Sequence, residues 1–134
     1  MKIVFDTNVL VSALISDGKP RELLNTIVIR GHTVIISKKI IKEFVEVTAD
    51  PKIQKYVTRH EVARFLHNLL PVSKVVIVRS KMGESRDPKD NPILATAYDG
   101  RADYLVSGDE DLLNMEKFRG IRIVKVAEML KMFK

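Results

Sequence analysis

Short apolar segments rich in β-branched residues alternate with helical segments along the whole chain. Five of them have the length and composition of buried strands, at residues 2–5, 32–37, 74–78, 102–108 and 121–126. Helical segments lie between them and after the last one, including a short helix expected at residues 110–118. Such alternation predicts a parallel sheet covered by helices on both faces. We therefore expect an α/β fold, a three-layer α/β/α sandwich around a parallel five-stranded sheet.

The length and composition of the chain exclude several classes of protein. With 134 residues, no internal repeat and no linker, residues 1–134 are expected to form a single domain. Cys is absent, which excludes disulfides and thiolate metal sites. No run of roughly eighteen apolar residues exists to span a membrane, and Asp6 and Asn8 interrupt any signal-peptide pattern. The sequence accordingly predicts a soluble, cytoplasmic protein.

The net charge points to a polyanionic partner. There are 23 basic and 17 acidic residues, which give a formal charge of +6. An excess of this kind favours nucleic acid as a partner, although a Lys-rich solubilising surface would have the same balance. Trp is absent and aromatic residues make up 6% of the chain, so base stacking is not expected to be the main mode of binding.

Acidic residues follow two of the predicted strands. The run "KIVFD" ends on Asp6, and the run "YLVSGD" ends on Asp109. An acid at the end of a buried strand is costly unless something pairs with it. Functional sites in open α/β sheets lie outside the carboxyl ends of the strands. If these two strands are neighbours in the sheet, the two carboxylates converge on one site.

Two further acids could join this site. Asp90 precedes the helix that starts near Pro92, where a carboxylate would also serve as an ordinary N-cap. Glu43 lies roughly 40° outside the apolar arc of its predicted helix, so it flanks the buried face. Its alternative role is that of a surface acid paired with Lys39 or Lys42.

Several carboxylates without basic partners are unstable together unless cations neutralise them. Hard oxygen ligands around an open site suit Mg²⁺ or Mn²⁺, and such ions support phosphodiester hydrolysis. Without the four acids, the rest of the chain carries 23 basic residues against 13 acidic ones. A basic surface around an acidic, metal-binding pocket is what a nuclease needs to attract the phosphate backbone.

Four blocks of the sequence together resemble PIN-domain ribonucleases. They are "IVFDTNVLVSAL", the segment around Glu43, "RDPKDNPILATA" and "ADYLVSGDEDLL", in this order along essentially the whole chain. The group they resemble most is the toxin components of prokaryotic toxin–antitoxin systems (VapC-like). The resemblance implies a sandwich fold and a cluster of acids that binds Mg²⁺ or Mn²⁺.

The resemblance also assigns roles to residues that match the family's motifs. The catalytic and metal-binding acids would be Asp6, Glu43, Asp90 and Asp109, with Asp111 as an auxiliary metal ligand. Asp87 competes with Asp90, which is preferred because it directly precedes the "PILATA" helix. Glu46 competes with Glu43 but lies farther from the apolar arc.

The implied substrate is single-stranded RNA, in which a water activated by the metal attacks a phosphodiester. Asn8 and Ser107 match small polar positions that support the site or touch the substrate phosphate. Arg86 and Lys89, beside Asp90, would contact the backbone, or else form a solvated loop face. The resemblance further implies a small antitoxin protein as partner and a homodimer.

Two other functions compete with this interpretation. The first is a non-catalytic RNA-binding or scaffold protein of the same fold, although all four family acids are present. The second is a phosphate-transfer receiver, which would need paired acids near the first strand and a Lys after the last. Asp6 stands alone there, and Lys125 is interpreted as an ordinary Lys of a basic chain.

Overall fold

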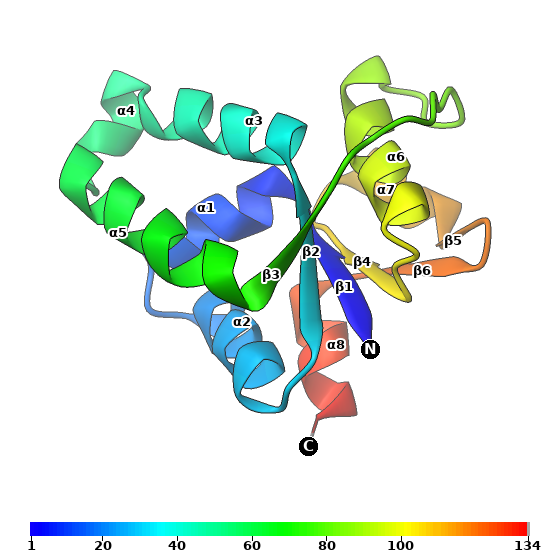
Figure 1. The fold of residues 1–134 in the computed structure, drawn as a ribbon, viewed down its shortest axis with the longest axis horizontal. Helices are drawn as coiled ribbons and strands as arrows, with labels where there is room; N and C mark the ends of the chain where they lie inside the picture. Colours follow the sequence, from blue (N-terminus) through cyan, green and yellow to red (C-terminus); the bar gives the residue numbers. More distant parts are fainter. Residues whose placement is uncertain (134) are drawn as a thin grey trace.

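A six-stranded sheet organises the molecule, and the computed structural model describes residues 1–133 (Figure 1). Its strands are β1 (Lys2–Phe5), β2 (Thr33–Ser37), β3 (Ser73–Val76), β4 (Tyr104–Val106), β5 (Lys117–Phe118) and β6 (Ile121–Val124). They lie in the order β3-β2-β1-β4-β6-β5. Every pairing is parallel except that between β5 and β6, which is antiparallel. The expected sheet of five parallel strands is therefore confirmed, with one short strand added at its edge.

Helices cover both faces of this sheet. They are α1 (Thr7–Ile15), α2 (Lys19–Ile29), α3 (Lys38–Thr48), α4 (Pro51–Gln54), α5 (Arg59–Leu69), α6 (Asn91–Asp99), α7 (Glu110–Met115) and α8 (Val126–Met132), with 3₁₀ turns η1 (Leu70–Val72) and η2 (Pro88–Asp90). Helices α1, α2 and α8 pack together on one side, and α6 and α7 lie on the other (Figure 1). The three-layer sandwich is thus confirmed. No helix among residues 1–133 is long and apolar enough to cross a membrane.

The central strands carry apolar side chains on both of their faces. Ile3, Val4 and Phe5 of β1 are at most 2% exposed, as are Ile35 and Ile36 of β2. Such continuous burial is typical of parallel strands that have a helical layer on each side. It leaves the strand ends as the places where polar side chains can lie without disrupting the core.

The chain changes direction across the sheet at β1. From β1 it moves through β2 to β3 at one edge, and it then returns to β4 on the other side of β1. Because crossover connections are right-handed, this return puts α6 and α7 on the face opposite α1 and α2. The space outside the carboxyl ends of β1 and β4 is therefore a topological switch point, where ligands bind in open α/β sheets.

One expected element is wrong. Residues 117–118 were expected at the end of the helix 110–118, but that helix ends at Met115 and Lys117–Phe118 form β5. Glu116, Arg119 and Gly120 all have positive φ angles (58°, 48° and 88°). The first ends the helix, and the other two form the tight turn between β5 and β6, where positive φ at both central residues matches the twist of a hairpin.

Helix α6 is joined to β2 by buried hydroxyl groups. Ser37, at the carboxyl end of β2, has its Oγ 2.9 Å from Oγ1 of Thr96 in α6. The Thr96 hydroxyl also donates to the carbonyl of Pro92 in the first turn of the same helix, at 2.8 Å. Since buried polar groups need partners, these contacts fix the position of α6 and of the acidic segment that precedes it.

Gly100, the residue that ends α6, packs tightly against β2. A Cβ at this position would lie 2.5 Å from Cγ2 of Ile35 and 2.9 Å from the carbonyl oxygen of Thr96. We expect Gly100→Ala to lower the free energy of unfolding by about 1–3 kcal/mol through overpacking. Gly83→Ala is the control, because a Cβ there would have no heavy atom within 4 Å. Thermal melts that give equal stabilities for the two variants would contradict this packing argument.

Candidate metal centre

Asp6 lies directly after β1, at the N-cap position of α1. Its carbonyl accepts hydrogen bonds from the N–H groups of Val9 (3.0 Å) and Leu10 (3.1 Å), but its carboxylate makes no cap contact. The carboxylate instead accepts a hydrogen bond of 2.7 Å from the hydroxyl of Ser107, just after β4. The Asp6 carboxylate is thus connected to the residue that follows the neighbouring strand.

Ser107 links the two strand ends. It is 1% exposed, and its N–H donates to the carbonyl of Val124 at 3.0 Å. While its hydroxyl donates to Asp6, it accepts a hydrogen bond of 3.0 Å from the N–H of Asp109. Asp109 caps α7 by accepting from the N–H of Leu112 at 3.1 Å. The strands before Asp6 and Asp109, β1 and β4, are therefore neighbours in the sheet, which was the condition for the two carboxylates to converge.

Crowding of carboxylates changes their protonation. Burial raises the pKa of Asp6 above its ordinary value, and the nearby charge of Asp109 acts in the same direction, while the hydrogen bond from Ser107 opposes them. Burial, followed by a hydrogen bond and charge repulsion from Asp109, raises the pKa of Asp90 to about 7. Asp6, Asp109 and Asp90 therefore belong to one electrostatically coupled group of acids.

Asp87 and Asp111 extend this group. Carboxylate oxygens of Asp87, Asp90 and Asp111 all lie within 4.8 Å of one another. Asp87 accepts a hydrogen bond of 3.0 Å from the N–H of Lys89 at the start of η2, and Asp111 lies in the first turn of α7. The sequence treated Asp87 and Asp90 as alternatives, but the structure brings both to the same place.

The loop that carries Asp87 and Asp90 is tied to its surroundings at several points. Asp99, at the end of α6, accepts hydrogen bonds from the N–H groups of Arg79 (2.7 Å) and Ser80 (2.9 Å). Glu84 forms a two-point contact with the guanidinium of Arg119, at 3.1 and 2.9 Å. The loop is therefore held both at its start and by the β5–β6 turn.

Glu43 is connected to the site through Thr7, the residue after Asp6. The Thr7 hydroxyl, which is 1% exposed, donates to Oε2 of Glu43 at 3.1 Å. Within residues 1–133 Glu43 has no ion pair with Lys39 or Lys42. Glu43 and Glu46 are both exposed, but Glu46 makes no side-chain hydrogen bond in the described part of the chain. The structure thus links Glu43, and not Glu46, to the neighbourhood of Asp6.

Hydroxyl groups, rather than cations, support three of these acids. Ser107 donates to Asp6, Thr7 to Glu43, and Ser85 to Asp90 at 3.1 Å. The two ion pairs found in the described residues involve other acids, Asp17 and Glu84. Neutral donors orient the carboxylates and leave their negative charge in place. A set of hard, uncompensated oxygen donors fits Mg²⁺ or Mn²⁺.

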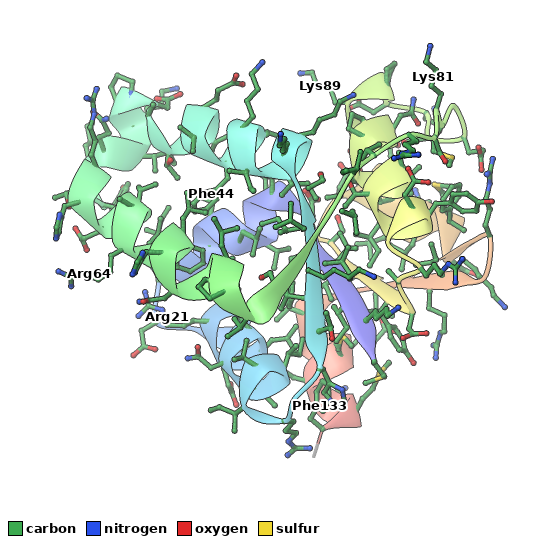
Figure 2. All side chains as sticks on the ribbon, in the orientation of Figure 1. Arg21, Phe44, Arg64, Lys81, Lys89 and Phe133 are labelled. Carbon is green, nitrogen blue, oxygen red and sulfur yellow. The ribbon has the colours of Figure 1, made fainter. Side chains whose placement is uncertain are left out.

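The other residues singled out by the sequence lie around this group. Asn8 is exposed in the first turn of α1, whereas Ser107 is buried between Asp6 and Asp109. Arg86 and Lys89 are exposed and have no ion pair within residues 1–133. Figure 2 shows Lys89 pointing outward at the upper edge of the molecule, beside the start of α3. These cations are therefore free to meet an anion outside the acidic group.

A cavity of about 650 Å³ opens beside Asp6 and Asp109. Two of the residues that line it, Lys19 and Lys125, were not selected as site residues from the sequence. Lys125 directly follows β6, and so it shares with Asp6 and Ser107 the position after a parallel strand. That shared position was the available signal. Lys19 comes from the start of α2, and nothing local to its sequence relates it to the acids.

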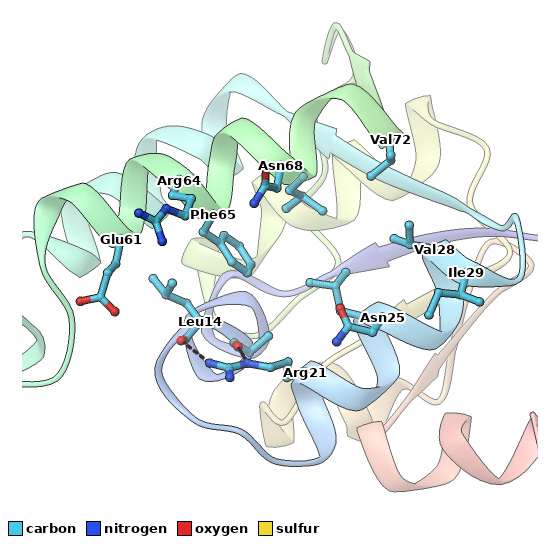
Figure 3. A pocket seen from close by; sticks show the side chains of 13 residues that line it. Leu14, Arg21, Asn25, Val28, Ile29, Glu61, Arg64, Phe65, Asn68 and Val72 are labelled. Carbon is cyan, nitrogen blue, oxygen red and sulfur yellow. Dashed lines mark hydrogen bonds between the residues drawn. The ribbon is translucent and has the colours of Figure 1, made fainter.

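A second groove, of about 640 Å³, lies away from the acids between α1, α2 and α5 (Figure 3). Apolar side chains such as Leu14, Val28 and Phe65 form much of its lining. Arg21 also lines this groove, and its guanidinium donates to the carbonyls of Ala13 (2.8 Å) and Leu14 (2.7 Å). This groove lacks a group of acids that could hold a cation, so it is a separate surface from the metal centre.

Residues 2–111 match the model of the PIN-domain family. The chain belongs to the PIN-domain family. Proteins of this family are generally nucleases. The matched residues contain all the acids described above, and they stop before β6 and α8.

Similar proteins are found by sequence and by structure. An uncharacterised protein of Methanocaldococcus jannaschii, MJ1680, is 31% identical over 117 residues, which cover 86% of this chain and 75% of that protein. The crystal structure of VapBC2 from Rickettsia felis, bound to a DNA fragment from its promoter, contains a chain with a similar fold. The TM-score is 0.63 at 15% identity, and the match covers 93% of this chain and 98% of the other. At that identity the likeness concerns the fold alone.

The raised pKa of Asp90 generates a prediction for the metal-free protein. Its pKa is about 7 in the folded protein against an ordinary value of 3.8, so between these values the folded state holds more protons than the unfolded state. Stability from this group is therefore greatest at low pH and is lost as the pH rises toward 7. In the presence of a chelator, we expect Asp90→Asn to raise the free energy of unfolding at pH 8 by on the order of 1 kcal/mol after solvent screening, and therefore to raise the melting temperature.

Asp17→Asn is the control for this experiment, because the side chain of Asp17 is 92% exposed. Melting curves from pH 4 to 8 should show a smaller pH dependence for Asp90→Asn than for the unmodified protein. A pH profile that Asp90→Asn leaves unchanged would contradict the crowding described above. Added Mg²⁺ or Mn²⁺ should also raise the melting temperature of the unmodified protein, because an ion that binds the folded state stabilises it.

Proposed function

We propose that this protein is a metal-dependent ribonuclease that hydrolyses phosphodiester bonds of single-stranded RNA. The observation that carries the proposal is the group of acids at the switch point, three of which are supported by neutral hydroxyls. Structural acids on a chain with a charge of +6 would be expected to pair with some of its many cations. Acids oriented without such cations favour a site for a divalent metal.

The ion would be held by Asp6, Asp90 and Asp109, with Asp111 and Asp87 beside them and Glu43 as a further ligand or outer acid. Bound there, Mg²⁺ or Mn²⁺ supplies Lewis-acid chemistry for phosphodiester hydrolysis. The protein's own contribution is orientation. Ser107 directs Asp6 away from its helix, and Ser85 directs Asp90, so these carboxylates can bind cations without prior rearrangement.

Exposed polar residues around the acids support RNA as the substrate. Arg86 and Lys89 lie on the loop that carries Asp87 and Asp90, and neither is used in an ion pair within the described residues. Contacts from such residues to phosphates add affinity without reading sequence. Asn8, which is exposed two residues after Asp6, adds a neutral donor. The preference for a single strand rests on the resemblance to PIN-domain ribonucleases.

We further propose that this domain, residues 1–134, acts in the cytoplasm as the toxin of a toxin–antitoxin pair. The solved structure with a similar fold is a VapBC2 complex, and the acid motifs resemble those of VapC-like toxins. A small antitoxin protein would be the partner, and a homodimer the assembly. The alternative is a non-catalytic RNA-binding or scaffold protein of the same fold, which would bind RNA without needing the metal.

Loss of one acid tests the catalytic proposal. We expect Asp6→Asn to lower the rate of RNA cleavage at least about 100-fold, since a metal ligand should matter more than the outer groups whose loss costs 10- to 100-fold. A chelator should abolish cleavage by the unmodified protein, and Mg²⁺ or Mn²⁺ should restore it. Asp17→Asn, which removes an exposed carboxylate, should keep full activity. Cleavage by Asp6→Asn at the rate of the unmodified protein would contradict the proposed role of Asp6 in catalysis.

The contact from Thr7 distinguishes the two glutamates of α3. We expect Glu43→Gln to weaken the affinity for Mn²⁺ about 10- to 100-fold, because its carboxylate is oriented toward the site by Thr7. Glu46→Gln is the matched change on the same helix and should leave the affinity within about twofold. Calorimetric titration with Mn²⁺ measures both. Equal effects of the two substitutions would remove Glu43 from the metal centre.

A further inference from the structure

The cavity beside Asp6 and Asp109 is lined by lysines as well as by these acids. Its volume is about 650 Å³, and its polar lining comprises Asp6, Asp109, Asn8, Ser12, Ser107, Lys19 and Lys125. That volume is within the range of pockets that bind small ligands. We infer that Lys19 and Lys125 form a phosphate subsite, which binds a backbone phosphate next to the bond that is cut. This inference rests on the proposed ribonuclease function and names part of its substrate site.

Sheet pairing and helix packing bring the two lysines to this place. Lys125 follows β6, and β6 pairs with β4 so that Val124 lies opposite Val106. The N–H of Ser107 donates to the carbonyl of Val124 at 3.0 Å, which puts Lys125 beside the strand end that carries Asp109. Lys19 opens α2, and α2 packs against α8, whose first turn follows Lys125. The subsite is therefore formed by the fold, not by neighbours in sequence.

The lysines share a cavity with acids and yet do not pair with them. Within residues 1–133 neither ammonium group comes within 4.0 Å of a carboxylate oxygen, and both residues are exposed. Both signs of charge therefore line one cavity without pairing directly. A bound cation on the acids and a phosphate between that cation and the lysines would alternate in charge across this space, so each contact would be attractive.

This position gives the substrate a second basic contact on the other flank of the acids. Arg86 and Lys89 belong to the segment beside Asp87 and Asp90, whereas Lys19 and Lys125 lie beside Asp6 and Asp109. A nucleic-acid strand laid across the acids would thus meet cations both before and after the bond to be cut. Phosphate contacts of this type position the strand and carry no sequence information.

Salt-dependent binding of RNA tests the subsite. The probe is a fluorescein-labelled, mixed-sequence single-stranded RNA, and every protein carries Asp6→Asn to prevent cleavage. One variant adds Lys19→Gln and Lys125→Gln. The matched control adds Lys55→Gln and Lys131→Gln, which remove the same charge from exposed lysines outside the cavity. Melting temperatures of all the proteins are compared first, to verify that each is folded.

Each phosphate contact to a single strand contributes about −0.7 to the slope of log K against log salt. We expect the variant with Lys19→Gln and Lys125→Gln to have a slope that is less steep by about 1.4. Raising the salt concentration from about 50 to 200 mM should then weaken RNA binding by this variant about sevenfold less than RNA binding by the Asp6→Asn parent. Lys55→Gln with Lys131→Gln should keep the parent slope. Equal slopes for the two double variants would overturn the subsite.

A second measurement separates the subsite from the proposed function. In proteins with Asp6 intact, loss of Lys19 and Lys125 should raise KM for RNA more than it lowers kcat, because a contact to a neighbouring phosphate that is not itself attacked is present in both ground and transition states. If the unmodified protein neither binds nor cleaves RNA, the proposed function fails. If it cleaves RNA and the cavity variant has the same KM as the control variant, only the subsite fails.

Discussion

Repulsion among like charges is the constraint to which the rest of this site responds. The sheet ends at β1 and β4 hold Asp6 and Asp109 next to one another, and burial together with the nearby Asp109 raises the pKa of Asp90 to about 7. Three buried hydroxyls hold acids in position without neutralising them. Such an arrangement costs folding free energy in the metal-free state. No basic side chain offsets that cost within the described residues, whereas a divalent cation would offset it, as the proposed function requires.

The strand order explains why these acids meet although they lie far apart in sequence. Only a chain that moves outward from β1 to β3 and then returns to β4 creates two neighbouring strand ends with diverging connections. Helix α3 adds Glu43 from one side of this opening, and the segment before α6 adds Asp87 and Asp90 from the other. The apolar strands fix the geometry, because their side chains are buried on both faces of the sheet between two layers of helices.

Much of this architecture could be predicted from the sequence, because it depends on local patterns. Alternating strands and helices predicted the sandwich, and the rule for strand ends selected Asp6 and Asp109 as neighbours. The fold also connects Glu43 to Thr7, as the helical position of Glu43 beside the apolar arc suggested. The sequence analysis preferred Asp90 to Asp87 and did not place the two together, since their spatial relation to Asp111 depends on contacts across the fold.

Other features escaped prediction for identifiable physical reasons. The turn between β5 and β6 uses Arg119 and Gly120 with positive φ, and Arg at the first position gives no strong turn signal. Lys125 was dismissed as an ordinary basic residue, because its proximity to Asp109 depends on the pairing of β4 with β6. Lys19 approaches the same cavity only because α2 packs against α8. Long-range packing, not local propensity, decides each of these.

The bidentate contact between Arg119 and Glu84 makes the C-terminal segment part of the smallest unit that could keep the site in shape. Residues 117–124 form the hairpin that holds the loop in front of Asp87, and β6 also covers the open side of β4. A fragment that stopped at residue 111 would retain every acid of the site. It would nonetheless expose one edge of β4 and release that loop, so the acids alone do not constitute an autonomous module. The C-terminal segment is the scaffold on which the acidic group depends for its shape.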